Sequence, residues 1–142
     1  MSEEIPFTYR ALNAEERDAL EQGLALASRL AFLSRPLTMV DVQKLYDDAL
    51  REKRIGDEAL IAIGLAFGQQ IINQTGFDWV RVSDQWGDET CVGPAGKSLN
   101  CAPISMIQKR LDRDEAIDLA TLAATISRSM NESIERGKVG DW

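Results

Sequence analysis

The chain has 142 residues, a net charge of −7 and no histidine. At this length a single domain buries about two thirds of the surface that its unfolded chain exposes, so it needs neither a metal nor a disulfide for stability. The lack of histidine excludes a Ser-His-Asp or Cys-His mechanism within the chain, and two cysteines are too few for a structural zinc site.

The acidic charge disfavours nucleic acid as a partner, because a phosphate backbone is repelled by a surface of the same sign. Residues 1–12 are expected to be a loosely attached lead-in, and their acidic start lacks the basic and apolar regions of a secretory signal. The longest apolar run, 59–77, is interrupted by glycine, glutamine and asparagine and is too polar to span a membrane. We therefore expect a cytoplasmic protein that is not attached to a membrane.

Two helices are predicted in the first part of the chain. Asn13 begins the sequence N-A-E-E, a capping-box pattern that Glu16 completes, and leucines and alanines follow at helical spacing. The first helix should end before Pro36, because the residue that precedes a proline is pushed out of the helical region. Thr38 can cap a second helix that runs to about Lys53.

A third helix at about 58–74 is the most apolar, which is typical of the buried centre of a domain. Asp57 is its predicted cap. One stripe of the helix should be nearly inaccessible to solvent; it consists of Leu60, Ile63, Phe67 and Ile71. Gly64 and Gly68 lie four residues apart, and this spacing predicts that a neighbouring element packs closely against them.

From Phe77 the apolar residues alternate, which predicts a three-stranded antiparallel meander. The second and third strands are expected at about 90–93 and 98–102, after glycine turns at 84–87 and 93–96. Along the first strand, Val80 and Val82 should face one side of the sheet, and Trp79 and Arg81 the other.

The last part of the chain is predicted to be helical again. Pro103 can start a short helix that turns Ile107 inward, and a longer helix should cover about 114–136. Residues 137–142 are expected to be a mobile tail. The predicted fold class is therefore α+β: one domain in which a helical layer around a central helix packs against a small antiparallel meander.

The two cysteines allow a prediction of register. If the turn is centred on Ala95, Cys91 and Cys101 lie opposite each other on adjacent strands. Directly opposed Cβ atoms are about 4.5 to 5.5 Å apart, slightly wider than a disulfide prefers. In a cytosolic chain we expect both thiols to be reduced.

The hairpin turn is the main candidate for a binding surface. Aromatic residues and arginine are enriched at binding hot spots, and acidic and basic residues lie close to the turn in sequence. The candidate residues are Trp86, Asp84, Asp88, Glu89, Arg81, Lys109 and Arg110. Trp79 is expected to pack under a helix, whereas Trp86 either covers the turn or binds a partner.

Each charged group also has a structural interpretation. The three carboxylates, spaced D-x-x-x-D-E, could contribute to a cation site, but acidic residues are also common turn formers and the spacing is not that of an EF-hand. Lys109, Arg110 and Arg113 could seat a phosphate or carboxylate, could form a solvated face with their acidic neighbours, or could pair with Asp84.

Three motifs occur in a familiar order: L-A-F-G-Q-Q-I at 65–71, W-V-x-V-x-D-x-x-G at 79–87, and P-I-S-M-I-x-K-R at 103–110. Together they resemble the small bacterial domains of the DUF3806 family, whose function is unknown. The resemblance covers about 60–122 and leaves the two N-terminal helices, 13–53, uncovered. It implies a bacterial α+β domain without an assigned reaction.

The sequence favours a non-enzymatic protein that binds a basic surface of a protein partner in an antidote-like or accessory role, with no metal or cofactor. The alternative is a small-ligand or anion-binding protein, or an enzyme. In that case the working groups would be the hairpin carboxylates together with Lys109 and Arg110.

Overall fold

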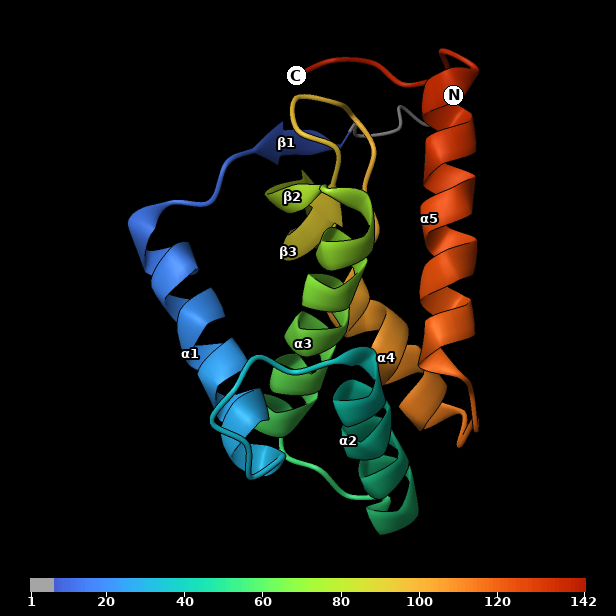
Figure 1. Cartoon of the computed structure of the whole chain (residues 1–142). Helices are drawn as coiled ribbons and strands as arrows, with labels where there is room; N and C mark the ends of the chain where they lie inside the picture. The colour runs from blue at the N-terminus through green and yellow to red at the C-terminus, as the bar shows by residue number, and fades with distance from the viewer. Residues whose placement is uncertain (1–6) are drawn as a thin grey trace.

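The computed structural model describes residues 7–142, which adopt an α+β fold with five helices and one three-stranded antiparallel sheet (Figure 1). The helices are α1 (Ala14–Leu30), α2 (Met39–Glu52), α3 (Asp57–Thr75), α4 (Pro103–Asp112) and α5 (Leu119–Glu135). The strands are β1 (Thr8–Arg10), β2 (Asp78–Asp84) and β3 (Gly87–Gly93). Within the described residues, no helix is long and apolar enough to cross a membrane.

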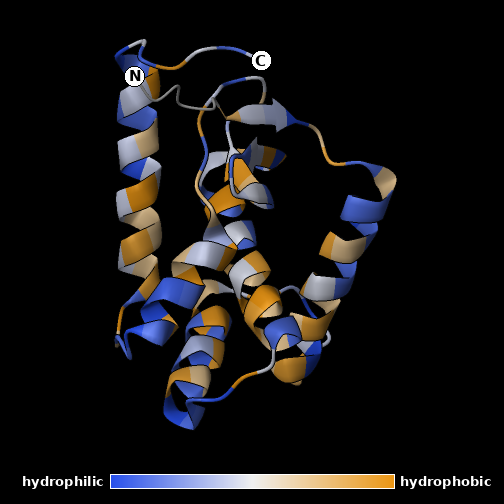
Figure 2. Ribbon diagram, turned by 180° about the vertical axis from the view of Figure 1, so that it is seen from behind, coloured by the Kyte–Doolittle hydropathy of each residue, from blue (hydrophilic) through white to orange (hydrophobic). Residues whose placement is uncertain are grey.

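Helix α3 runs through the middle of the molecule, with α1 on one side and α5 on the other (Figure 1). The sheet lies at one end of α3, and α2 lies at the opposite end. Seen from behind, both outer helices show alternating hydrophobic and hydrophilic bands (Figure 2). This banding is expected of helices that place one face on a core.

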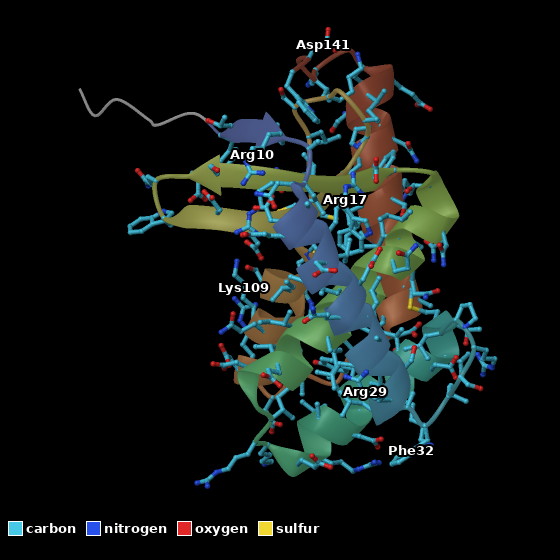
Figure 3. All side chains as sticks on the ribbon, turned by 90° about the vertical axis from the view of Figure 1, so that its left-hand side faces the viewer. Arg10, Arg17, Arg29, Phe32, Lys109 and Asp141 are labelled. Atoms are coloured by element: carbon cyan, nitrogen blue, oxygen red, sulfur yellow. The ribbon has the colours of Figure 1, made fainter. Side chains whose placement is uncertain are left out.

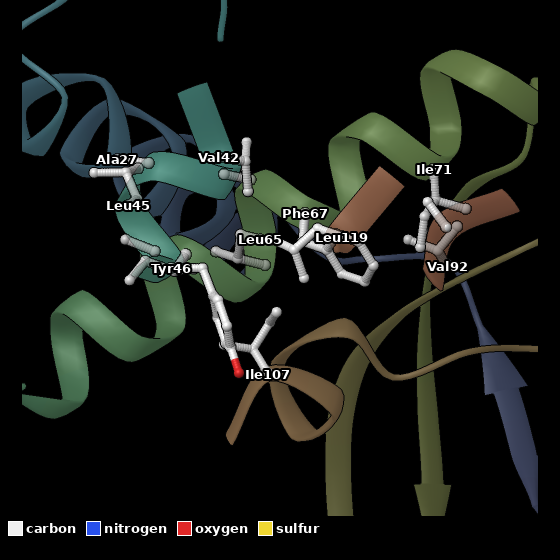
Figure 4. Close-up of a cluster of buried hydrophobic side chains, with 14 of the residues drawn as sticks. Ala27, Val42, Leu45, Tyr46, Leu65, Phe67, Ile71, Val92, Ile107 and Leu119 are labelled. Atoms are coloured by element: carbon white, nitrogen blue, oxygen red, sulfur yellow. The ribbon is translucent and has the colours of Figure 1, made fainter. Parts of the chain in front are cut away.

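The core is centred on α3, as the sequence predicts. Ile63, Phe67 and Ile71 are buried, and Figure 4 shows Phe67 beside Leu119 of α5. The prediction is wrong for Leu60, which is only partly buried because it lies in the first turn of α3, at the edge of a surface hollow.

The two glycines of α3 allow close packing, which confirms the prediction from their spacing. A Cβ atom at Gly64 would lie 2.6 Å from the backbone Cα of Ile104 in α4. A Cβ atom at Gly68 would lie 2.7 Å from the Trp79 ring and 2.8 Å from Pro103. Both α4 and the sheet therefore approach α3 more closely than any residue with a side chain would permit.

Helices α1 and α2 begin where the sequence predicts. The Asn13 side chain accepts a hydrogen bond from the backbone N–H of Glu16 at 2.8 Å, and the Glu16 carboxylate accepts one from the backbone N–H of Asn13 at 3.0 Å, which completes the capping box. Thr38 forms the equivalent box at the start of α2. The predicted cap of α3 is wrong: Gly56 occupies the N-cap position and Asp57 is already the first helical residue.

Helices α4 and α5 have no side-chain cap of their own. Glu89 of β3 accepts hydrogen bonds from the backbone N–H and the hydroxyl of Ser105, at 3.3 and 2.7 Å, and so closes the start of α4. The amide of Gln43 in α2 accepts from the Leu119 N–H at 2.7 Å and donates to the Ile117 carbonyl at 3.0 Å. Side chains from distant elements therefore secure both helix starts.

The predicted start of the last helix is wrong. Helix α5 begins at Leu119 and not near Asp114, whose φ of 53° lies in the left-handed region. The backbone of Asp114 and Glu115 closes the end of α4 through bonds to Leu111 and Arg110, so these residues terminate one helix and do not start the next.

The sheet has three antiparallel strands, as the sequence predicts, but its order is β1-β2-β3 and the predicted strand at 98–102 is wrong. Part of the predicted lead-in forms β1, which pairs antiparallel with β2 through Tyr9 and Val82. The segment 98–102 contributes only an isolated bridge. It cannot extend the ladder because its Ser98 N–H bonds to Gly140 and its Leu99 N–H bonds to Lys97.

The predicted register of the cysteines is wrong by one residue. Val92 lies opposite Cys101, with reciprocal backbone bonds of 3.0 and 2.8 Å, while Cys91 lies opposite Val80. A shift of one residue reverses every side chain, so Cys91 packs on the other face of the sheet, with Val80 and Val82. Neither cysteine forms a disulfide.

The C-terminal segment is not the expected mobile tail. The Trp142 ring stacks on Tyr9 of β1 with a centroid separation of 6.5 Å. The Trp142 N–H donates to the Gly96 carbonyl at 3.0 Å, and Lys97 pairs with Asp141 at 2.6 Å. This segment therefore joins the loop after β3 to the first strand.

Candidate functional site

The hairpin tip between β2 and β3 is a fixed turn that projects an aromatic ring into solvent. Asp84 accepts a hydrogen bond from the Trp86 N–H at 2.7 Å, and Gly87 supplies the φ of 129° that closes the turn. Ser83 donates to Asp88 across the two strands at 2.6 Å. The Trp86 side chain is 86% exposed, so it does not cover the turn.

The three predicted carboxylates do not converge. Asp84 holds the turn, Asp88 bonds to Ser83, and Glu89 reaches the start of α4. Each therefore has a separate structural partner. In the part of the chain that the structure describes, no three acidic or cysteine side chains gather as a metal site would require.

Arg81 lies on the helix-facing side of the sheet with Trp79, as the alternation predicts, but it is engaged in a network. Its Nε lies 3.1 Å from Glu16, and its guanidinium donates to Thr90 at 2.9 Å. Arg10 also binds Glu16 with two bonds of 2.6 and 2.8 Å. Arg81 thus joins the sheet to α1 and is not part of the hairpin tip.

The Glu16 carboxylate is strongly stabilised in this network. Hydrogen bonds from Arg10, then from the Asn13 backbone, lower the pKa of Glu16 from 4.5 to about 2. The same carboxylate both caps α1 and binds two arginines, so it links α1 to β1 and β2. Sequence reasoning identified only its capping role.

Lys109 and Arg110 lie on α4, about one helical turn beyond the contact between Glu89 and Ser105. Arg110 donates to the Met106 carbonyl in its own helix at 3.1 Å. Among the ion pairs between described residues, none joins Asp84 to either cation. Figure 3 shows Lys109 on the side of α4 below the hairpin.

Two hollows flank the hairpin. The one beside the tip, of about 370 Å³, is bordered by Trp86, Asp84 and two residues that the sequence did not single out, Phe7 and Asn100. The hollow on the helix side, of about 490 Å³, is bordered by Glu16 and Arg81. Only the tertiary contact of β1 with β2 brings Phe7 to the hairpin, so no local pattern could have indicated it.

A further hollow, of about 700 Å³, lies away from the hairpin, between the connection of α2 to α3 and the end of α4. Its charged residues include Lys53, Arg54, Asp112 and Asp114. Lys53 and Asp114 form a loose ion pair of 3.8 Å across it. The charged sequence K-R-I-G-D at 53–57 was the available signal, but it is also typical of an ordinary helix connection.

The thiols are poor nucleophiles at neutral pH. Burial raises the pKa of Cys91 to about 12 and that of Cys101 to about 11. Because the thiolate is the reactive form, neither cysteine is suited to nucleophilic chemistry.

The fold and site thus define an α+β domain with an exposed aromatic hairpin beside small surface hollows. The model of the DUF3806 family, described as a domain of unknown function, matches residues 39–122, more than half of the chain, and the chain belongs to this family. The matched segment starts earlier than the sequence motifs suggest, because it includes α2.

The fold resembles a protein from Bacteroides thetaiotaomicron VPI-5482, known from a crystal structure at 1.50 Å resolution. The TM-score is 0.70 and the sequence identity is 12%, so the likeness concerns the fold alone. The match covers 87% of this chain and 48% of the other, so this chain spans about half of that protein's length. None of the curated proteins matches the chain.

Proposed function

We propose that this chain is a bacterial, cytoplasmic, non-enzymatic protein that binds a protein partner through its β2–β3 hairpin tip. The supporting observation is the 86% exposure of Trp86 on a turn that hydrogen bonds hold in place. An indole ring in water offers apolar area that a partner can cover, and a fixed turn loses little conformational entropy on binding.

The charges favour a partner segment that contains lysine or arginine. Asp84 ends β2 and Asp88 lies at the start of β3, two residues before and after Trp86, and the whole chain carries a net charge of −7. A cationic side chain can lie on the face of the indole while it donates hydrogen bonds to a carboxylate. The net charge also accelerates the approach of a basic partner.

The cytoplasmic location is part of this proposal, and two buried cysteines that form no disulfide are compatible with it. The bacterial origin is proposed from the resemblance to the DUF3806 domains, whose family model matches residues 39–122.

The first test is capture of partners from native lysate on the immobilised full chain and on its Trp86→Ala variant. The variant should retain the melting temperature within a few degrees, because removal of an exposed side chain changes stability by about 1 kcal/mol or less. Partner binding should fall about tenfold or more. Val40→Ala, which truncates a 78% exposed side chain on α2, is the control and should leave both properties unchanged.

The second test identifies the chemistry of the captured protein. Its basic segment, made as a peptide, should bind the chain in a salt-dependent manner, and Asp88→Asn should weaken that binding. Unfolding of the Trp86→Ala variant would show that Trp86 is structural. Capture that persists in this variant would place the binding surface elsewhere, and α1, which lies outside the family match, would be tested next.

One observation favours the small-ligand alternative: a hollow of about 700 Å³ is lined by apolar residues and by charges of both signs, with Lys53 and Arg54 beside Asp57, Asp112 and Asp114. A small organic molecule with both an anionic and a cationic group would suit such a surface, its anionic group bound by Arg54. If this is the function, a screen of carboxylates and phosphates should raise the melting temperature, and Arg54→Ala should abolish the rise. The enzyme alternative has less support, because its carboxylates have separate structural partners.

A further inference from the structure

Strand β3 has a free edge next to the hairpin tip. Its Val92 exchanges two backbone hydrogen bonds with Cys101, at 3.0 and 2.8 Å, on the side away from β2. Alternate residues of a strand direct their N–H and C=O groups to the same side, so Asp88 and Thr90 also direct theirs away from β2. Within residues 7–142, no backbone hydrogen bond satisfies these groups.

The sequence explains why the chain itself leaves this edge open. The segment that bridges to Val92 runs antiparallel to β3, so its continuation would place Pro103 opposite Thr90. Proline has no N–H to donate to the Thr90 carbonyl, and α4 starts at Pro103. A strand edge with unpaired backbone groups is a template for another extended chain.

A hollow lies on each face of the sheet at this edge, and Asp88 and Glu89 border both of them. The hollow on the tip side, of about 370 Å³, is also bordered by Trp86 and Asp84. The hollow on the helix side, of about 490 Å³, has an apolar wall in which Ile61 is 42% exposed. The apolar residues of this wall are Ala19, Leu20, Ile61, Leu65 and Ile104.

We propose that the partner binds as an extended segment that adds a strand to the free edge of β3, with apolar side chains in the helix-side hollow and basic side chains in the tip-side hollow. This inference rests on the proposed function, because it states how the partner of the hairpin tip is held. Successive residues of a strand point to opposite faces, so a segment that alternates apolar and basic residues fits both hollows at once. Its backbone satisfies the open groups of Asp88 and Thr90.

The charges at this edge select a basic segment. Asp84, Asp88 and Glu89 accept hydrogen bonds only from neutral groups, and no ion pair between described residues involves them. Arg81, the cation of the helix-side hollow, is already bound to Glu16 at 3.1 Å. Lys109, below the hairpin in Figure 3, leaves the carboxylates in excess.

The same charges disfavour a second copy of this chain at the edge. Two copies paired through β3 would bring the acidic residues of one edge, Asp88 among them, against those of the other. Like charges opposed across two strands are destabilising, and each copy carries a net charge of −7.

The probe for strand addition is a synthetic hexapeptide with blocked ends that alternates lysine and isoleucine. It is titrated into the isotope-labelled full chain and followed by NMR. The amide resonances of Asp88 and Thr90 should shift, and added salt should weaken the binding.

Two modified peptides distinguish backbone pairing from side-chain contact. One carries a backbone N-methyl group on every lysine, and the other carries one on every isoleucine. Only every second N–H of an added strand faces the sheet, so one of the two peptides should bind about tenfold or more weakly. The other should bind like the unmodified peptide.

A pair of protein variants tests the same edge. Thr90→Pro removes an N–H from the free edge and keeps the ladder with β2, because an edge strand accepts proline where the N–H faces solvent. Thr90→Ala is the matched control, since both changes remove the hydroxyl that accepts from Arg81 at 2.9 Å. Thr90→Pro should weaken peptide binding about tenfold or more, and Thr90→Ala by about twofold or less. If Thr90→Pro does not fold, the N-methyl peptides decide the question.

Equal binding of the two N-methyl peptides, or no binding of the unmodified peptide, would overturn strand addition. Shifts of the Thr90 resonance that depend on protein concentration without peptide would assign the edge to a second copy and would also overturn it. These failures are distinct from failure of the hairpin site. Loss of the captured partner in Trp86→Ala but not in Thr90→Pro would retain the tip and reject the edge.

Discussion

Helices α1 and α2 are closed at their N-termini by their own residues, whereas α4 and α5 depend on side chains from other elements. Asn13 and Thr38 lie three residues before the carboxylates that complete their capping boxes. The start of α4 uses Glu89 from β3, and the start of α5 uses Gln43, 76 residues away in the chain. The two regions therefore differ in how far apart in sequence the stabilising partners lie.

This difference separates two kinds of information. A capping box is complete within four residues and forms with its helix. A cap supplied from another element exists only after the elements have packed, so its residue type carries no local signal. Glu89 illustrates the consequence, because an acidic residue near a hairpin suggests a ligand site, while its carboxylate in fact binds the start of a helix.

The largest expected effect concerns α3, against which both regions pack. Phe67→Ala should lower the free energy of unfolding by about 3 to 5 kcal/mol, because it loses the transfer free energy of a buried ring and leaves a cavity. Urea unfolding followed by circular dichroism measures this change. A loss below about 1 kcal/mol would show that α3 is not the common support of the two regions.

The next effect tests the cap of α5. Gln43→Ala should cost about 1 to 3 kcal/mol, because the Leu119 N–H and the Ile117 carbonyl lose their partners in a partly buried position. Amide hydrogen exchange at Leu119 should accelerate more than exchange in α1. Equal acceleration in both helices would indicate a general loss of stability and contradict a specific role in closing α5.

The cap of α4 should give a somewhat smaller effect. Glu89→Ala should cost about 1 to 2 kcal/mol, the usual range for loss of a helix cap. Glu89→Gln retains an acceptor oxygen and should recover part of the loss. Asn13→Ala removes the N-cap of α1 and is the matched change among the helices capped by their own residues; it should lower the free energy of unfolding by about 1 kcal/mol. If Glu89→Ala leaves stability unchanged, the carboxylate is available for a ligand after all.

The smallest effect concerns the stability of the fold at low pH, to which the capping-box carboxylates of α1 and α2 contribute. The Arg10 hydrogen bond lowers the pKa of Glu16 from 4.5 to about 2, and the Arg35 hydrogen bond lowers that of Asp41 from 3.8 to about 2. Both carboxylates therefore stabilise the fold fully above about pH 4.5, and this contribution declines as the pH falls and is lost below about 2.

Glu16→Gln and Asp41→Asn should each flatten the dependence of the melting temperature on pH between about 4.5 and 2. Asp57→Asn, in the first turn of α3, is the control, because Asp57 is not part of a capping box. A pH profile that is unchanged in Glu16→Gln would show that its network with Arg10 does not form in solution.

The sequence alone determined the features that short-range physics decides. The starts of α1 and α2, the apolar centre of α3, the close approach at Gly64 and Gly68, and the turn at Trp86 all follow from spacing or from the conformational needs of a few adjacent residues. The family match agrees with motifs from the same region.

Four features were decided only by the tertiary structure. They are the pairing of β1 with β2, the register of the cysteines, the start of α5 and the docking of the C-terminal segment. Each depends on a partner far away in the chain: β1 on β2, Cys101 on Val92, Leu119 on Gln43, and Trp142 on Tyr9. Such pairings compete with alternatives of similar local propensity, and packing of the whole molecule selects among them. The hairpin residues show the same division, because their turn was predictable from sequence while the separate partners of the three carboxylates were not.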